Sequence, residues 1–144
     1  MPPTLAPTPD TIRRARVFWL QSQDDLKLAR RHLRRRSYHD GSFLSMQAAL
    51  NALSTVCRLH GHFMPPQHGL REMLGLCGQC DPRFDAVLAG EAALDTVPER
   101  NPFAPADPPE AAEAFTRSCL AEAEQVVGAV RGYLKEHRRR FFAP

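Results

Sequence analysis

The stretch from Phe43 to His62 constrains the fold more than any other part of the chain. Apolar side chains and one histidine recur there at alternating steps of three and four residues: Phe43, Met46, Leu50, Leu53, Cys57 and His60. This spacing places them along one face of a helix. Small residues that let a second helix approach closely lie beside that face: Ala48, Ala49, Ala52 and Ser54. We therefore expect a helix packed on two sides, either as the central helix of one bundle or as a helix that also meets a partner chain.

Residues near the expected helix ends indicate where these helices begin and end. Asp40 lies just before the Phe43 run and can accept free backbone N–H groups as an N-cap. Asp10 or Thr11 can cap an earlier helix in the same way. Gly61 lies where the Phe43 helix could end in a left-handed turn.

Two further segments keep the three–four alternation and predict long amphipathic helices. The first carries Ile12, Ala15, Trp19, Ser22, Leu26, Ala29 and Leu33. The last, from about Glu110 to Arg140, carries Ala112, Phe115, Cys119, Ala123, Val126, Val130 and Leu134. Trp19 is expected in the core, because a large aromatic side chain gains most from burial.

The stretch between these helices predicts a third helix in two pieces. One piece runs from about His68 to Leu76, and the other follows the helix-start signal of Asp81 and Pro82. The second piece carries Phe84, Val87, Leu88, Ala92 and Leu94. Residues 96–109 contain closely spaced prolines that exclude a helix. No strand-like alternation is present, so the sequence predicts an all-α fold, an antiparallel up-down four-helix bundle whose third helix is broken.

Length and composition fit one domain. We place it at residues 10–142, after a flexible proline-rich arm of residues 1–9. No apolar run is long enough to cross a membrane, and the first residues lack a signal-peptide pattern, so we expect a cytoplasmic protein without a membrane partner. Four scattered cysteines do not suggest a disulfide framework. The net charge is only +3, but the arginines are clustered, and clustering matters more than the sum.

Three segments together resemble the HEPN domain family. They are Trp19-Leu20 with Asp24-Asp25-Leu26 and Ala29, then Met46-Gln47-Ala48-Ala49-Leu50-Asn51-Ala52-Leu53, then Gly61 with Pro65-Pro66-Gln67-His68-Gly69-Leu70. The resemblance covers the chain from about Asp10 to His137. Leu50 and Asn51 stand where the family usually has a Glu–Lys pair. The family's link into its last helix is echoed by Pro98, Arg100, Pro102 and Phe103.

The resemblance implies a function related to nucleotides or RNA. Many HEPN proteins are ribonucleases with an Arg, often followed by Asn, and a His after four to six intervening residues. In a metal-independent cut, this His moves protons at the ribose 2′-OH and the Arg stabilises phosphate charge. Arg100 and Asn101 begin such a motif here, but Pro105, Ala106 and Asp107 occupy the positions of the His. We therefore expect Arg100 and Asn101 to bind a ligand rather than to support robust cleavage.

Other basic residues are candidates as well. In an up-down bundle, Arg34, Arg35, Arg36 and His39 lie at the same end as the Arg100 link, and we expect them to bind the ligand too. The alternative is a solvated helix end whose cations match the helix dipole. Arg131 and His137 match the Arg–His motif formally and are the catalytic candidates, although the same sequence fits an ordinary basic helix end.

The remaining motifs indicate neither a metal nor a cofactor. Cys77 and Cys80 have zinc-knuckle spacing, but a closed site needs two further ligands. As a redox motif the pair lacks the usual strand–helix context, so we expect a break between helix pieces there. No phosphate loop or dinucleotide-binding turn is present. Asp24 and Asp25 are expected at the surface.

The sequence therefore favours a small homodimeric protein that binds a nucleotide or RNA. The resemblance adds a possible partner, a minimal nucleotidyltransferase, in a toxin–antitoxin-like pair. One alternative is a metal-independent endoribonuclease that uses Arg100, or Arg131 with His137. Another is a purely structural dimer subunit whose arginines are only solvated.

Overall fold

The computed structural model of the protein describes residues 7–62, 69–100, 107–138 and 141. These residues form helices and no strand, which confirms the predicted all-α class. The long helices are α1 (Pro9–Arg34), α2 (Tyr38–Leu59) and α5 (Pro109–His137), and the short elements are α3 (Leu70–Cys80), α4 (Arg83–Ala86) and the 3-10 helix η1 (Ala93–Glu99). No helix in the described part of the chain is long and apolar enough to cross a membrane.

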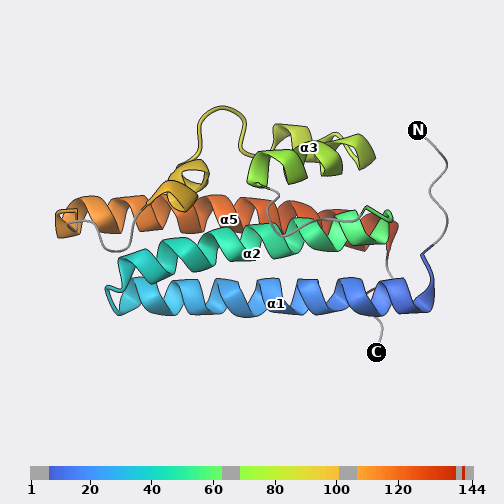
Figure 1. The fold of residues 1–144 in the computed structure, drawn as a ribbon, viewed down its shortest axis with the longest axis horizontal. Coiled ribbons are helices and arrows are strands. Elements are labelled where there is room, and N and C mark those ends of the chain that lie inside the picture. Colours follow the sequence, from blue (N-terminus) through green and yellow to red (C-terminus); the bar gives the residue numbers. More distant parts are fainter. Residues whose placement is uncertain (1–6, 63–68, 101–106, 139–140, 142–144) are drawn as a thin grey trace.

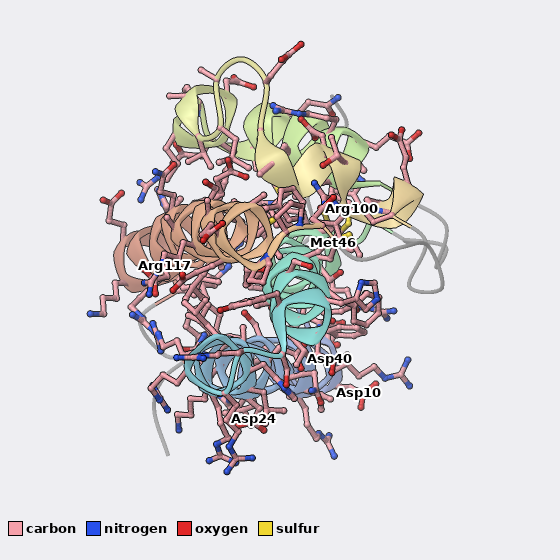
Figure 2. All side chains as sticks on the ribbon, turned by 90° about the vertical axis from the view of Figure 1, so that its left-hand side faces the viewer. Asp10, Asp24, Asp40, Met46, Arg100 and Arg117 are labelled. Atoms are coloured by element: carbon pink, nitrogen blue, oxygen red, sulfur yellow. The ribbon has the colours of Figure 1, made fainter. Side chains whose placement is uncertain are left out.

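The helices lie in three layers (Figures 1 and 2). α2 and α5 lie side by side in the middle and run in the same direction. α1 packs antiparallel to α2 on one side, and α3, α4 and η1 cover the other side. Because α2 has neighbours on both sides, Ala48, Ala49, Ala52 and Leu53 are fully buried. The two-sided packing predicted for α2 is therefore confirmed within one chain, and its contact with a partner chain stays a prediction.

The predicted apolar faces of α1 and α5 are buried, and that of α2 is buried in part. Trp19 in α1 and Val130 in α5 lie in the core. In α2, Phe43 is 46 % exposed and Leu50 is only half-buried, whereas the core contains the other apolar residues of the predicted face: Met46, Leu53 and Cys57. The buried surface of α2 also includes its alanines, because α1 and α5 approach it closely from two directions.

Asp25 is a second difference from the expected surface. Asp24 is exposed as predicted, but Asp25 is buried between α1 and α2. Its carboxylate accepts hydrogen bonds from Gln21 Nε2 and from Asn51 Nδ2, each at 2.8 Å. Asn51 therefore donates a hydrogen bond across the helix pair from the position where the family usually has Lys.

Both predicted N-caps are wrong, while the predicted helix end at Gly61 is confirmed. α1 begins at Pro9, whose fixed φ suits the first turn, and Thr8 Oγ1 accepts the N–H of Thr11 at 3.1 Å. α2 begins at Tyr38, two residues before Asp40. The first turn of α2 is held by α5, because the Thr116 hydroxyl donates to the Tyr38 carbonyl at 3.0 Å. At the other end, Gly61 adopts φ 77°.

The third helix is broken, as predicted, but its pieces differ from those expected. α3 extends through Cys80, so the Cys77–Cys80 segment is its last turn and not a break. α3 runs in the same direction as α2 (Figure 1), and the chain returns through α4 and η1. Asp81 accepts the N–H of Arg83 at 2.9 Å, yet α4 is a single turn and Leu88 adopts φ 55°. The expected helix over residues 84–94 is therefore wrong.

The proline-rich segment also departs from expectation at its start. Residues 96–99 belong to η1, although a helix was excluded from residue 96 onward. A 3-10 helix tolerates Pro98 because it is short and Pro98 lies near its end. The expectations for residues 1–6, for 65–68, for Asn101, Pro102, Phe103, Pro105 and Ala106, and for Arg140 lie outside the described residues.

Candidate functional site

Three helix ends meet at one end of the bundle, which we call the basic end. They are the C-terminus of α1 and the N-termini of α2 and α5, at the left of Figure 1. Arg34, Arg35 and Arg36 are exposed there, and none has an ion pair within the described residues. Arg36 adopts φ 63°, which ends α1 and turns the chain into α2. His39 is exposed in the first turn of α2.

Arg100 is held against the start of α5 by two contacts. Its Nη1 lies 2.8 Å from Asp107 Oδ2, and its guanidinium lies 3.4 Å from the centre of the Phe115 ring. Stacking of this kind fixes a guanidinium plane while leaving N–H groups free to bind an anion. Asp107 is one of the residues predicted to stand at the position of the family's His, and the structure pairs it with Arg100.

Arg100 and the arginines at residues 34–36 lie on two sides of the same turn of α5. Arg100 packs on Phe115, whereas the adjacent Thr116 contacts Tyr38 at the start of α2. Arg100 is seen from this end of the bundle in Figure 2. No hydrogen bond or ion pair among the described residues joins Arg100 to His39. The structure therefore brings the two groups to one end of the molecule, on neighbouring sides of α5, without direct contact.

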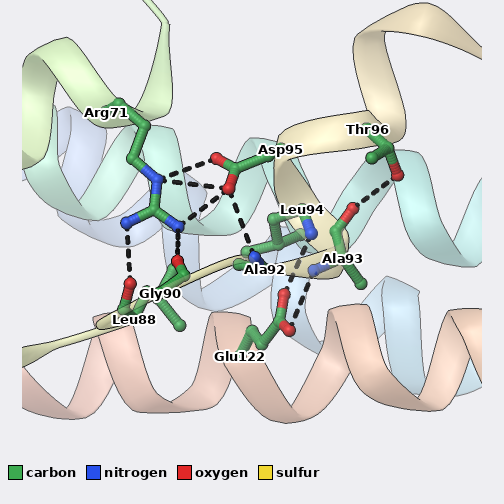
Figure 3. Close-up of polar contacts among 9 residues, drawn as sticks. All are labelled: Arg71, Leu88, Gly90, Ala92, Ala93, Leu94, Asp95, Thr96 and Glu122. Carbon is green, nitrogen blue, oxygen red and sulfur yellow. Dashed lines mark hydrogen bonds and ion pairs between the residues drawn. The ribbon is translucent and has the colours of Figure 1, made fainter.

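A polar clamp positions η1, which leads directly to Arg100 (Figure 3). Arg71 in α3 binds the Asp95 carboxylate and donates to the carbonyls of Leu88 and Gly90, each at 2.7 Å. The hydrogen bond from Arg71 lowers the pKa of Asp95. Glu122 of α5 accepts the N–H groups of Ala93 and Leu94 at 3.0 and 2.9 Å, as N-cap carboxylates do.

The two catalytic candidates, Arg131 and His137, contact different elements. Arg131 faces α1, where its Nη2 donates to Gln23 Oε1 at 2.6 Å and its guanidinium lies over Trp19. His137 packs against Tyr133, with its Nε2 3.5 Å from Asp81 Oδ2. Side chains six positions apart on an α-helix point in directions about 120° apart around its axis. Arg131 and His137 therefore do not converge on one phosphate.

The opposite end of the bundle holds a cluster that the sequence did not single out. Tyr133 is 3 % exposed and its hydroxyl makes a short hydrogen bond with His60 Nε2. Burial, with Arg138 and two other histidines, lowers the pKa of His60, and burial raises the pKa of Tyr133. Both groups are therefore neutral near pH 7, and the hydrogen bond joins the phenol to a neutral imidazole. This bond fastens the end of α2 to α5 across 73 residues of sequence, a separation that no local motif reveals.

Asp81, Glu136 and His137 offer three possible metal-ligand atoms within 4.8 Å of one another. However, the Arg83 guanidinium already contacts both carboxylates: its Nε lies 3.2 Å from Asp81 Oδ1, and its Nη2 binds Glu136. A metal ion would have to displace this resident cation. The arrangement is best described as an ion-pair network that ties α4 to α5.

The described residues form a helical domain with a cluster of exposed arginines at one end. The HEPN domain model matches residues 15–133, which is most of the chain. The protein belongs to the HEPN family. Searches among curated proteins and among solved structures find no match.

Proposed function

We propose that this HEPN protein is a homodimer that binds single-stranded RNA through the phosphate groups at its basic end. The observation that carries the proposal is the exposed set of Arg34, Arg35 and Arg36, without acidic partners in the described residues, beside an Arg100 presented on Phe115. Arginines that are not neutralised attract the phosphate backbone. His39, exposed at the same end, is proposed to contribute as well.

Binding without cleavage is the outcome that this chemistry favours. Proton transfer at a ribose 2′-OH needs a group within hydrogen-bond reach of the scissile phosphate. Asp107 pairs with Arg100 where the family's His would be, and an anionic side chain there also opposes phosphate. The alternative ribonuclease that uses Arg131 with His137 gains no support, because Arg131 faces α1 whereas His137 lies beside Asp81, between α3 and α4.

Dimerisation is supported by exposed apolar side chains on the outer layer. Val17 and Leu20 on α1 are 62 % and 57 % exposed, and Leu28 and Phe43 are also exposed. The hydrogen bond from Ser22 to the Ala48 carbonyl sets the register of α1 and α2, which places Leu28 and Phe43 at the same level along the bundle. Large apolar groups left in water at several points of one helix are typical of a protein interface.

The proposed protein partner is a minimal nucleotidyltransferase in a toxin–antitoxin-like pair, and this rests on family membership. It predicts that a nucleotidyltransferase encoded beside this protein co-purifies with it after joint expression. It also predicts that the partner restores growth if this protein alone is toxic. Joint expression that gives two separately eluting proteins would contradict the pairing while leaving RNA binding untouched.

The RNA proposal can be tested with a matched pair of double variants. Fluorescence anisotropy of a labelled single-stranded RNA, in EDTA, gives the Kd over a range of salt concentrations. R34A/R35A removes two exposed cations from the basic end, whereas R13A/R14A removes two from the start of α1, where both pair with Asp10. Arg36 is left intact because it forms the turn between α1 and α2, with φ 63°.

R34A/R35A is expected to weaken binding and to reduce the slope of log Kd against log salt by about 1.4, as loss of two phosphate contacts predicts. R13A/R14A is expected to bind like the unmodified protein. Equal losses in both variants would show that only overall charge matters and would refute a localised site. Cleavage of the RNA in EDTA would replace the binding role with a nuclease.

A further inference from the structure

Two buried cysteines from different helices face each other. Cys57 Sγ of α2 and Cys77 Sγ of α3 lie 3.7 Å apart, and both residues are almost fully buried. The third cysteine nearby, Cys80, is partly exposed, and its Sγ donates instead to the Leu76 carbonyl of its own helix. The contact is therefore between Cys57 and the first cysteine of the Cys77–Cys80 motif, not within that motif.

We propose that Cys57 and Cys77 form a peroxide-sensitive dithiol that closes to a disulfide between α2 and α3. This inference is independent of RNA binding. A disulfide needs the two sulfurs to move from 3.7 Å to about 2.05 Å, a shift that side-chain rotation and a small movement of α3 can supply. α3 is a short helix on the outside of the bundle, and such elements open locally more easily than a central helix.

The surroundings of Cys57 and Cys77 give the two thiols different roles in the oxidation. The hydrogen bond with Cys77 lowers the pKa of Cys57, whereas the hydrogen bond with Cys57 and burial raise the pKa of Cys77. Cys77 Sγ also donates to the Leu53 carbonyl at 3.7 Å, which holds its proton. Cys57 is thus the thiolate former and Cys77 the thiol that resolves its oxidised form. Cys119 is buried in α5, which raises its pKa to about 12 and leaves it unreactive.

The oxidation balances with hydrogen peroxide as the oxidant. The Cys57 thiolate attacks one peroxide oxygen, the O–O bond breaks, and hydroxide leaves to be protonated to water. Cys57 is then a sulfenic acid. Cys77 sulfur attacks the Cys57 sulfur, the S–O bond breaks, and the oxygen leaves as a second water with the proton of Cys77. Two thiols lose two electrons and peroxide gains them. Peroxide is close to water in size, which suits a reaction at a buried pair.

The test uses the reduced full-length chain, treated with increasing hydrogen peroxide in a chelator, then stopped with catalase and alkylated under denaturing conditions. Trypsin places Cys57 in peptide 37–58 and both Cys77 and Cys80 in peptide 72–83. Mass spectrometry should find these two peptides linked in the unmodified protein and in Cys80→Ala and Cys119→Ala. The link should be lost completely in Cys57→Ala and Cys77→Ala, with circular dichroism confirming that each variant folds.

In Cys77→Ala the sulfenic acid of Cys57 lacks its resolving thiol, so dimedone should label Cys57 several-fold more than in the unmodified protein. Linkage of Cys77 to Cys80 would overturn the proposal, as would loss of the 37–58 link in Cys80→Ala. Recovery of both Cys57 and Cys77 as alkylated thiols, at a peroxide concentration that oxidises a free cysteine peptide, would overturn it as well.

Discussion

Asp25 illustrates how one side chain can shape the contact between two long helices. Only 5 % of it is exposed, and its carboxylate is held by Gln21 on its own helix and by Asn51 on α2. A buried carboxylate without such donors costs far more than these hydrogen bonds contribute. The pair therefore fixes the register of α1 on α2 more than it adds to stability.

Asn51→Ala should lower the free energy of unfolding by about 1–3 kcal/mol, because Asp25 loses a donor and remains buried. Urea titration followed by circular dichroism measures this. Asp24→Ala, one residue away and exposed, is the control and should stay within about 0.5 kcal/mol of the unmodified protein. Equal effects of the two substitutions would mean that Asp25 is solvated in solution.

His60 gives the molecule a stability that depends on pH. Its pKa is lowered in the folded state by burial and by neighbouring cations, mainly Arg138. Below the ordinary histidine value of 6.5, the unfolded chain takes up a proton at His60 while the folded chain resists it, so the stability falls as the pH falls towards the folded pKa.

Urea midpoints measured between pH 8 and pH 5 should therefore drop more steeply for the unmodified protein than for His60→Gln. Proton NMR of the His60 ring should give a midpoint below the ordinary histidine value of 6.5. If the two proteins lost stability in parallel, the acid sensitivity would have to reside in other groups.

At the scale of elements, η1 depends on a side chain from another helix. Glu122 of α5 accepts two of the N–H groups that begin η1, and Arg71 of α3 holds Asp95 within it. Short 3-10 helices have few hydrogen bonds of their own. The position of Arg100, directly after η1, therefore rests on contacts supplied by α3 and α5.

Glu122→Ala should destabilise the protein by about 0.5–2 kcal/mol, the usual cost of losing a capping side chain. In the Glu122→Ala variant, the amide hydrogens of Ala93 and Leu94 should exchange with solvent faster than in the unmodified protein. Glu124→Ala is the comparison, since it removes an exposed ion pair with Arg30 worth about 0–1 kcal/mol. Unchanged exchange at both amides would show that η1 forms without Glu122.

The elements also show which parts of the fold a sequence can predict. α1, α5 and the existence of α2 followed from apolar periodicity, because each buries a continuous face. The direction of α3 and the start of α2 did not follow, because they depend on distant contacts such as Cys77 with Leu53 and Thr116 with Tyr38. Leu88, with its positive φ, carries no local signal for the reversal that follows α4.

For the whole molecule, the grouping of the basic end followed from the predicted order of helices alone. α3 runs in the same direction as α2, away from the end where Arg34 lies. The chain after α3 then leads back to that end before α5 begins, and this brings Arg100 there. The partners of these residues could not be predicted. Asp107 beside Arg100 and Tyr133 beside His60 are contacts of folded geometry, and they decide which arginines and histidines are available to a ligand.

The proposed homodimer is a property of the whole molecule that a surface substitution can isolate. Val17 and Leu20 point away from the core, so replacing both with Glu removes apolar surface without creating a cavity. V17E/L20E should elute as a monomer in size-exclusion chromatography with light scattering, at concentrations where the unmodified protein is a dimer. Lys135→Glu, an exposed change on α5, should leave the dimer intact. Because the basic end lies away from Val17, the monomeric variant should retain RNA binding with a weaker apparent Kd, as expected when two sites no longer act together.

An unmodified protein that is monomeric at every concentration would refute the dimer. A dimer that survives V17E/L20E would move the interface to another face.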